Sequence, residues 1–277
     1  MEIEGLARQA RDHQACSEFG GGCLLIAMTR EVSPRFAECE LTHLARQEIN
    51  LGLARSQHHE YENALKEMGC RIRRLPVEPN MPDSVFIEDT AVVLDEAAIV
   101  TRMGAASRRE EARSVASSLK NDRKIYHVVS PGTLEGGDVL KIEKTIYVGL
   151  SSRTNESGIS QLKEFVTPYQ YEVVSVPIER CLHLKSAVSH IGKDKLLINR
   201  SWVDPQQFGA MELIDVDPEE PYAANALLVG AELMYPINFP KTLRRLIRKG
   251  IAVREVDVSE LQKAEGAVTC CSLIFIN

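Results

Sequence analysis

The sequence has no apolar run near the roughly 18 residues that are needed to cross a bilayer. Its opening segment also lacks the apolar core of a signal peptide. No basic stretch is present and the formal net charge is -6, whereas nucleic-acid binding depends on Lys and Arg side chains that neutralise phosphates. We therefore expect a cytoplasmic protein that binds neither a membrane nor a nucleic acid. A cationic small molecule suits this negative field better.

A disulfide framework is missing as well. The sequence contains seven cysteines, an odd number, and most of them are scattered singly: Cys16, Cys23, Cys39, Cys70 and Cys181. We expect free thiols throughout. A lone cysteine among apolar residues usually serves packing, and this is the role predicted for Cys23, Cys39, Cys70 and Cys181.

Several catalytic motifs are absent: there is no GxGxxG after a strand, no Walker loop, no GxSxG and no HExxH. Dinucleotides, nucleotide phosphates and a serine nucleophile thus lose support. No Pro/Ser-rich linker divides the chain, and 44% hydrophobic with 26% charged residues is the balance of a folded globular protein. We expect residues 1–277 to form a single domain.

What the sequence does contain is a repeated pair of short apolar segments joined by a tight polar turn, which is typical of a β-hairpin. The four pairs are 91–94 with 97–100, 138–142 with 145–149, 187–191 with 195–199, and 226–230 with 233–236. Apolar segments near both ends, 22–30 and 270–277, have no such partner. We therefore predict that the C-terminal strand pairs with the N-terminal one.

Helical patterns separate the hairpins, for example 107–119, which opens with a capping box formed by Ser107 and Glu110. Each connector leads to one more strand: 70–77, 124–130, 172–178, 211–216 and 252–258. These starts recur roughly every 40 to 55 residues, a spacing typical of repeat architectures. Five such α/β units imply a closed ring around a central cavity. The alternative is a two-layer α/β sandwich in which the spacing is accidental.

Four polar clusters are placed in or beside the apolar strands, where a buried polar group must be paired or functional. They are PDSVFIED at 82–89, TLEGGDV at 133–139, HLKS at 183–186 and TCCS at 269–272.

These clusters resemble the dimethylarginine dimethylaminohydrolases, members of a guanidino-modifying superfamily that includes arginine deiminases and amidinotransferases. TRMGAASRRE from Thr101, VGLSSRTN from Val148 and PYAAN from Pro221 extend the resemblance, in the family's order, over nearly the whole chain. It implies a five-unit pseudo-symmetric α/β propeller with a central active-site cavity. It also implies a small-molecule substrate and neither a metal nor an organic cofactor.

The resemblance assigns Cys270, the first cysteine of TCCS, as the nucleophile, His183 as general acid and base, and Glu135 as the carboxylate that orients the histidine. Cys270 is expected at the beginning of a strand and facing the cavity, so that alternation along the strand points Cys271 into the core. The glycines at 136–137 would let backbone approach closely beside Glu135. Without the family, His183 could equally be a satisfied core histidine.

A guanidinium keeps its charge because its pKa exceeds roughly 12, so its binding site needs carboxylates in a planar arrangement. The resemblance assigns this role to Glu88 and Asp89, which we expect in an otherwise apolar strand. It assigns Asp83 to the α-amino group of the substrate, and Arg102 and Arg153 to the α-carboxylate. From the residues alone, the two acids could mark an exposed strand edge and the arginines could be surface charges.

The family's mobile flap resembles the segment Arg46–Gln57 and the stretch before it, with Leu41 as the match to its substrate-facing residue. Ser186 and Ala264 are the remaining matches to substrate contacts.

The activity implied is hydrolysis of Nω-methylated arginine to citrulline and the methylamine, through a thiouronium on Cys270. The alternative is an arginine deiminase or another guanidine or ureido hydrolase, but deiminases carry Asp where this chain has Lys185. A catalytically silent binding protein is a different class. A metal site of Cys270, Cys271 and His183 lacks the usual structural-zinc spacing, so zinc inhibition is expected instead of a zinc requirement. Monomer and homodimer both stay open.

Overall fold

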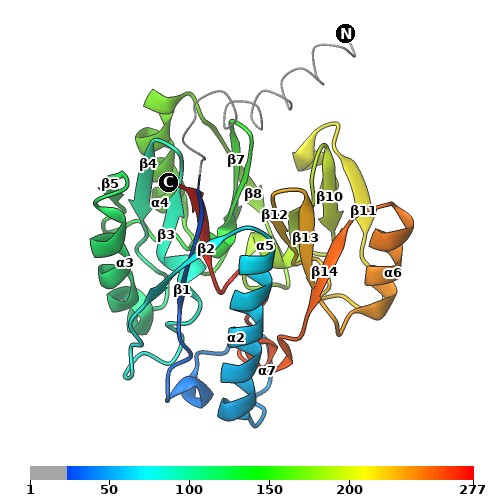
Figure 1. Ribbon diagram of the computed structural model, residues 1–277. Coiled ribbons are helices and arrows are strands. Elements are labelled where there is room, and N and C mark those ends of the chain that lie inside the picture. The colour runs from blue at the N-terminus through cyan, green and yellow to red at the C-terminus, as the bar shows by residue number, and fades with distance from the viewer. Residues whose placement is uncertain (1–23) are drawn as a thin grey trace.

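The computed structural model describes residues 24–277, so Cys16 and Cys23 lie outside the described residues. It contains five three-stranded sheets, with α2, α3 and α6 on the periphery (Figure 1). Cys39, Cys70 and Cys181 are free and buried, which confirms their predicted packing role. Among residues 24–277 no helix is both long and apolar enough to span a bilayer.

Each sheet has the same construction: two antiparallel strands, and a third strand parallel to the second. The hairpins turn at residues suited to tight turns, such as Gly230 between β12 and β13, whose φ of 60° favours glycine. Four of the five units are β3 (Ala91–Val93), β4 (Ala97–Val100) and β5 (Lys124–His127); β6 (Val139–Ile142), β7 (Thr145–Leu150) and β8 (Glu172–Pro177); β9 (Val188–His190), β10 (Lys195–Ile198) and β11 (Glu212–Asp215); β12 (Leu227–Val229), β13 (Glu232–Pro236) and β14 (Val253–Val256).

The remaining unit joins the two ends of the described chain. β15 (Leu273–Ile276) pairs antiparallel with β1 (Leu25–Arg30), and β2 (Arg71–Leu75) runs parallel to β1. Figure 1 shows the red β15 alongside the blue β1. The predicted pairing of the C-terminal with the N-terminal strand is confirmed.

The first strand of every unit faces one central cavity of about 430 Å³, lined from β3, β6, β9, β12 and β15. Five separate sheets around one cavity form the predicted five-unit propeller, and the two-layer sandwich is wrong. The strands nearest the cavity are short and mostly apolar. The segments that lead into these inner strands therefore converge at one end of the cavity.

Helices connect the second and third strands of most units: α2 (Leu51–Glu67), η3 (Ala106–Glu111) with α3 (Ala112–Leu119), α4 (Glu156–Val166) with η5 (Thr167–Tyr169), and α6 (Pro240–Arg248). The unit of β9 to β11 has only the 3-10 turn η6 (Pro205–Phe208). Shorter elements are η1 (Phe36–Glu38), η2 (Ile87–Thr90), η4 (Gly136–Asp138), α5 (Leu184–Ala187) and α7 (Ser259–Gln262).

The capping box predicted at Ser107 is wrong. The segment begins as a 3-10 turn without a side-chain cap, and the Ser107 hydroxyl donates to Glu40 Oε1 at 2.6 Å. A partner distant in the sequence has thus replaced the local one, Glu110, which pairs with Arg113. A tertiary contact of this kind is invisible to a local pattern.

Helix α2 packs its buried face, including Ala54, Tyr61 and Leu65, against the units of β1 and β13. Burying one such leucine stabilises the fold by roughly 1.5 to 3 kcal/mol. The Tyr61 hydroxyl bonds with the carbonyl of Val268 at 2.9 Å and with the Ser272 hydroxyl at 2.7 Å. The helix is thereby fixed to the two sides of the TCCS segment.

Candidate active site

Five of the polar residues singled out in the sequence lie on segments that lead into inner strands. Glu88 and Asp89 belong to η2 before β3, Glu135 precedes η4 and β6, His183 precedes α5 and β9, and Cys270 precedes β15. The repeat of the fold thus brings together side chains that are far apart in the sequence. All five polar side chains come from equivalent places in their units.

Cys270 lies in a turn, three residues before β15, and not at the start of that strand as expected. Its backbone N–H donates to the Ala267 carbonyl at 3.2 Å, and its carbonyl accepts from Glu88 N–H at 3.0 Å. The Cys270 side chain is half-buried, whereas Cys271 is fully buried in the core, with its Sγ 3.7 Å from the Ala267 carbonyl. Both cysteines belong to or pack against the same core cluster, so that Cys270 faces the cavity stays a prediction, and strand alternation does not apply in this turn.

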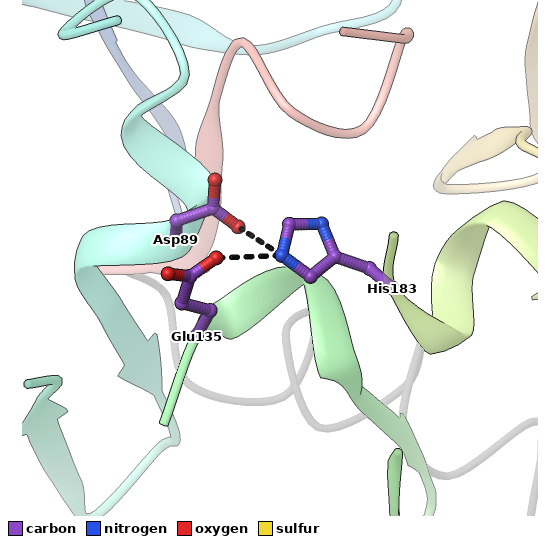
Figure 2. A group of neighbouring side chains, drawn as sticks. All are labelled: Asp89, Glu135 and His183. Atoms are coloured by element: carbon purple, nitrogen blue, oxygen red, sulfur yellow. Dashed lines mark hydrogen bonds and ion pairs between the residues drawn. The ribbon is translucent and has the colours of Figure 1, made fainter. Parts of the chain in front are cut away.

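His183 and Glu135 are in direct contact, as predicted. Nε2 of the imidazole is 2.7 Å from Glu135 Oε2, and Asp89 Oδ1 approaches the same nitrogen at 3.9 Å (Figure 2). The second oxygen of Glu135 accepts the Gly104 N–H at 3.0 Å, and Glu135 itself is fully buried. The ring therefore has a fixed orientation, set by a carboxylate that has little freedom to move.

The imidazole of His183 is protonated at neutral pH. Burial by itself lowers its pKa, but the charge of Asp89 and the hydrogen bond to Glu135 outweigh burial and raise the pKa to about 9. In return, His183 holds the pKa of Glu135 and of Asp89 below their ordinary values despite burial. His183 is thus ready to donate a proton.

Gly136 and Gly137 allow the segment after Glu135 to pack closely against Glu88 and His183. A Cβ on Gly136 would lie 2.0 Å from the Glu88 carbonyl oxygen, and one on Gly137 would lie 2.6 Å from His183 Nδ1. Asp138 follows and accepts from Leu184 N–H at 2.9 Å and from the Ser151 hydroxyl at 2.6 Å. It fixes the backbone just after His183.

Glu88 and Asp89 occupy a 3-10 turn and not the strand that we expected. Glu88 Oε2 accepts from the Thr269 hydroxyl at 2.8 Å, and Oε1 forms an ion pair with the Lys185 ammonium. Asn225, of the PYAAN segment, extends this network, since its side-chain amide donates to the Lys185 carbonyl and to Thr269 Oγ1 at 3.0 Å each. Burial raises the pKa of Glu88, and Lys185 opposes this rise.

Asp89 is held by Arg108, a residue for which no role was predicted. Nη1 of this buried arginine lies 2.8 Å from Asp89 Oδ2, while Nη2 contacts Glu111 Oε2 at 3.0 Å and the Phe86 carbonyl at 3.2 Å. The Gly137 N–H donates to Asp89 Oδ1 at 3.0 Å. The carboxylate is thus charged and fixed in position. Arg108 lies in the segment TRMGAASRRE, which is part of the family resemblance. Its burial could not be predicted, because an arginine in a charged run of sequence is usually exposed.

The carboxylates have a consequence for the nucleophile. Burial and then the charges of Glu88 and Asp89 raise the pKa of the Cys270 thiol well above its ordinary value. This raised pKa favours the thiol over the thiolate. A bound cation that neutralises the two carboxylates would remove part of this effect.

Asp83 and Arg153 both hold the loop that follows η1. Asp83 accepts the Glu40 N–H at 3.1 and 3.3 Å, and Arg153 Nη2 donates to Thr42 Oγ1 at 2.9 Å. Nη1 of Arg153 also lies 3.9 Å from Glu135 Oε1.

Arg102 lies on the neighbouring segment and donates to the Gly132 carbonyl at 3.1 Å. The segments of Arg102 and Arg153 are closely packed, because a Cβ on Gly104 would lie 2.7 Å from the Arg153 carbonyl oxygen. The two arginines predicted to bind a carboxylate thus come from adjacent segments, but they have different partners.

The predicted flap segment needs correction. Residues from Leu51 onward already belong to α2, so the loop itself is 39–50, which we call the flap. Leu41 is half-buried on this flap and packs on the same core cluster as the buried Ala264. Ser186 lies in α5 and lines a cavity of about 230 Å³ together with His43 and Leu44 of the flap.

The nearest approach to a metal-ligand set among residues 24–277 is Asp89, Glu135 and His183, whose ligand atoms lie within 4.8 Å of one another. Each of these atoms already has a protein partner in the contacts given above. The proposed set of Cys270, Cys271 and His183 is not formed, because Cys271 is buried in the core. That the protein needs no metal stays a prediction.

Comparison with known proteins identifies relatives of this chain. The family described as N,N dimethylarginine dimethylhydrolase, eukaryotic, matches residues 40–276. The N(G),N(G)-dimethylarginine dimethylaminohydrolase of Streptomyces coelicolor is 39% identical over 249 residues, which are 89% of this chain and 95% of that protein. The enzyme of the same name from Pseudomonas aeruginosa is 34% identical over 224 residues, 80% of this chain and 88% of that protein.

A solved structure of the Pseudomonas aeruginosa enzyme, a cysteine-to-serine mutant complexed with citrulline, superimposes with a TM-score of 0.86 at 30% sequence identity. The match covers 91% of this chain and 100% of that one. The family match, the relatives and the shared propeller agree with the residues assembled at the inner strands. The chain belongs to the dimethylarginine dimethylaminohydrolase family.

Proposed function

We propose that this chain is a single catalytic domain that hydrolyses Nω-methylated arginine to citrulline and the corresponding methylamine. The observation that carries the proposal is the combination of Cys270, two buried carboxylates beside it, and a protonated His183 fixed by Glu135. This combination supports a nucleophile, an acid and a binding site for a planar cation within one site. The relatives named for this activity share the fold and most of the chain length.

Binding comes first. The guanidinium lies against Glu88 and Asp89, which offer charge-assisted hydrogen bonds in a buried environment. Asp83 accepts from the α-amino group, and Arg102 and Arg153 donate to the α-carboxylate. Leu41, Ser186 and Ala264 complete the walls of the site.

The thiol of Cys270 then loses its proton. Burial, Glu88 and Asp89 raise the pKa of the thiol, and the positive charge of the guanidinium offsets the effect of the two carboxylates. The thiolate is thus formed when the substrate is present, and its proton passes to solvent. This coupling limits the reactivity of the cysteine toward other electrophiles.

Attack by Cys270 Sγ on the central guanidinium carbon forms a C–S bond. The C–N bond to the methylated nitrogen breaks as His183 donates its proton, and the neutral amine leaves. A thiouronium on Cys270 remains, with its positive charge against Glu88 and Asp89. His183 is now neutral.

Water completes the reaction. Neutral His183 takes a proton from water, and the hydroxide attacks the thiouronium carbon. The C–S bond breaks, citrulline leaves, and Cys270 and protonated His183 are restored. The released amine takes up the proton that the thiol gave to solvent. No redox step or cofactor is needed, and the absence of one stays a prediction, as does a cytoplasmic location.

The choice of methylated over free arginine rests on Lys185. A deiminase carries Asp at this position, and that carboxylate would be left unpaired by a dimethylated nitrogen, at a cost of roughly 1 to 3 kcal/mol. This chain places an ammonium group there, and it is already paired with Glu88. Methyl groups on the leaving nitrogen therefore leave no acceptor unsatisfied.

The experiment is incubation of the protein with asymmetric dimethylarginine, monomethylarginine, arginine and agmatine, with citrulline and the released amine both measured. We expect dimethylamine and methylamine from the two methylated substrates, and a higher kcat/KM for them than for arginine. Comparable efficiency on arginine, with ammonia released, would establish the deiminase alternative. Binding of all four without any turnover would establish a silent binding protein.

A further inference from the structure

The base of the flap is anchored independently of its tip. Arg46 donates from both terminal nitrogens to the carbonyls of Ala37 and Cys39, at 2.6 Å each. On the outgoing side, Lys263 donates to the Glu48 carbonyl at 2.9 Å, and Asn50 N–H donates to Glu260 Oε2 at 2.8 Å. The loop is therefore closed at its base, like an Ω-loop, and the tip at residues 40–44 can move while the base stays in place.

The tip is held closed by three acidic or basic side chains of the site. Asp83 accepts from the Glu40 N–H, and Arg153 donates to the Thr42 hydroxyl. The strongest contact is made by Glu265, whose carboxylate accepts the backbone N–H groups of residues 42, 43 and 44 at 2.5 to 3.0 Å. Three amides thus converge on one carboxylate, an arrangement that binds an anion well.

Two of these three contacts use groups that the substrate needs. On the proposed function, Asp83 binds the α-amino group and Arg153 the α-carboxylate. When substrate binds, it competes with the flap for both side chains. Glu265 has no such role and keeps its contacts to the flap, so it becomes the contact on which closure depends.

The segment that carries Glu265 is rigid and close to the nucleophile. Glu265 has a φ of 59°, and a Cβ on the following Gly266 would lie 2.2 Å from the Phe86 ring. The backbone from Ala267 onward forms the turn of Cys270. A flap fastened to Glu265 is therefore fastened to the same rigid segment as the nucleophile.

We propose that Glu265 is the latch of this enzyme: a positioning residue that holds the flap tip over bound substrate. It acts through the backbone of residues 42–44 and touches neither the guanidinium nor the reacting carbon. With the latch closed, the site stays dry while Glu88 and Asp89 hold the cation, and charge-assisted bonds are stronger in a dry site.

The variants Glu265→Ala and Glu265→Gln test the latch, with Glu48→Gln as the matched control. Glu48 is an exposed acid on the flap whose side chain makes no hydrogen bond among the contacts described for residues 24–277. Gln keeps one acceptor oxygen, so Glu265→Gln should be intermediate. Hydrogen exchange at residues 42–44 and steady-state kinetics on dimethylarginine are both measured, in the free enzyme and with citrulline.

We expect Glu265→Ala to raise KM for dimethylarginine about tenfold, with a much smaller change in kcat, and to speed amide exchange at 42–44 in the citrulline complex. Glu48→Gln should change neither. Wild-type-like protection at 42–44 in Glu265→Ala would overturn the latch. A loss of kcat at unchanged KM would overturn it as well. If the wild type fails to hydrolyse dimethylarginine, the proposed function fails, and exchange in the free enzyme still tests the latch.

Discussion

The ammonium group of Lys185 forms an ion pair with the carboxylate of Glu88, the group assigned to the guanidinium of the substrate. Both side chains line the central cavity, and Glu88 also accepts from Thr269, the residue directly before Cys270. The site thus contains a cation of its own. A guanidinium that enters must share Glu88 with this lysine.

Replacing Lys185 by methionine tests what the lysine contributes. Lys185 lowers the pKa of Glu88, which burial raises. Without the lysine, Glu88 takes up a proton at a higher pH and loses its charge nearer to neutrality. We expect KM for dimethylarginine to rise about tenfold at neutral pH, and part of the loss to be recovered at alkaline pH. Lys120→Met, at an exposed lysine, is the control. A lower KM in Lys185→Met would mean that the lysine only competes with substrate.

The two adjacent cysteines should respond differently to serine. Cys270→Ser should abolish turnover, because a serine hydroxyl is a far weaker nucleophile than a thiolate. Cys271→Ser should keep most of the activity, while a hydroxyl in the core lowers the free energy of unfolding by roughly 1 to 3 kcal/mol. Citrulline formation and thermal unfolding are the measurements. Equal loss of activity in both variants, each being folded, would remove Cys270 from its role.

Protonation of the leaving amine depends on His183. Its pKa is about 9, raised by Asp89 and Glu135, so proton donation to the leaving amine should fail as the pH rises through that value. Glu135→Gln removes a charge and an acceptor, which lowers the pKa of His183. The alkaline fall of kcat should therefore shift to lower pH in Glu135→Gln. His183→Ala should bind substrate and not hydrolyse it. Unshifted pH profiles would contradict the role of Glu135.

Arg102→Ala and Arg153→Ala should impair substrates that carry an α-carboxylate. Each arginine supplies charge-assisted hydrogen bonds worth roughly 1.5 to 3 kcal/mol, so KM for dimethylarginine should rise at least tenfold. Agmatine lacks the carboxylate and should be a poor substrate of every form. Arg113→Ala, an exposed arginine of α3 with 79% of its side chain accessible, is the control. Efficient use of agmatine by the wild type would refute the carboxylate clamp.

The strands could be predicted because each inner strand is a short apolar run bounded by turn residues. The pairing of β1 with β15 followed from two apolar segments that had no neighbour in the sequence. The hydrogen-bond partners of individual side chains were harder to predict from the sequence. Ser107 bonds with Glu40, and Arg108 bonds with Asp89 from a charged run that resembles an exposed helix face. Both contacts depend on how separate units pack, and no local pattern contains that information.

The site residues themselves came from the resemblance, and the structure adds how they are held. Glu88 and Asp89 lie in a 3-10 turn, and the Glu88 N–H donates to the Cys270 carbonyl, a contact between units. The core position of Cys271 was predicted correctly, whereas Cys270 lies in a turn and not at the start of a strand. The spacing of apolar residues in the sequence therefore predicts whether a residue is buried better than it predicts the residue's backbone conformation.

The pairing of β1 with β15 also affects how the protein is made. β1 is synthesised early, yet the strand that completes its sheet, Leu273–Ile276, emerges only after the other four units. Until then β1 has an unpaired edge, which invites pairing with other chains, and contacts of such long sequence separation form slowly. Cys270 is synthesised immediately before β15. A nascent chain on the ribosome therefore acquires its nucleophile and closes its ring in the same short interval, and an incomplete chain has neither.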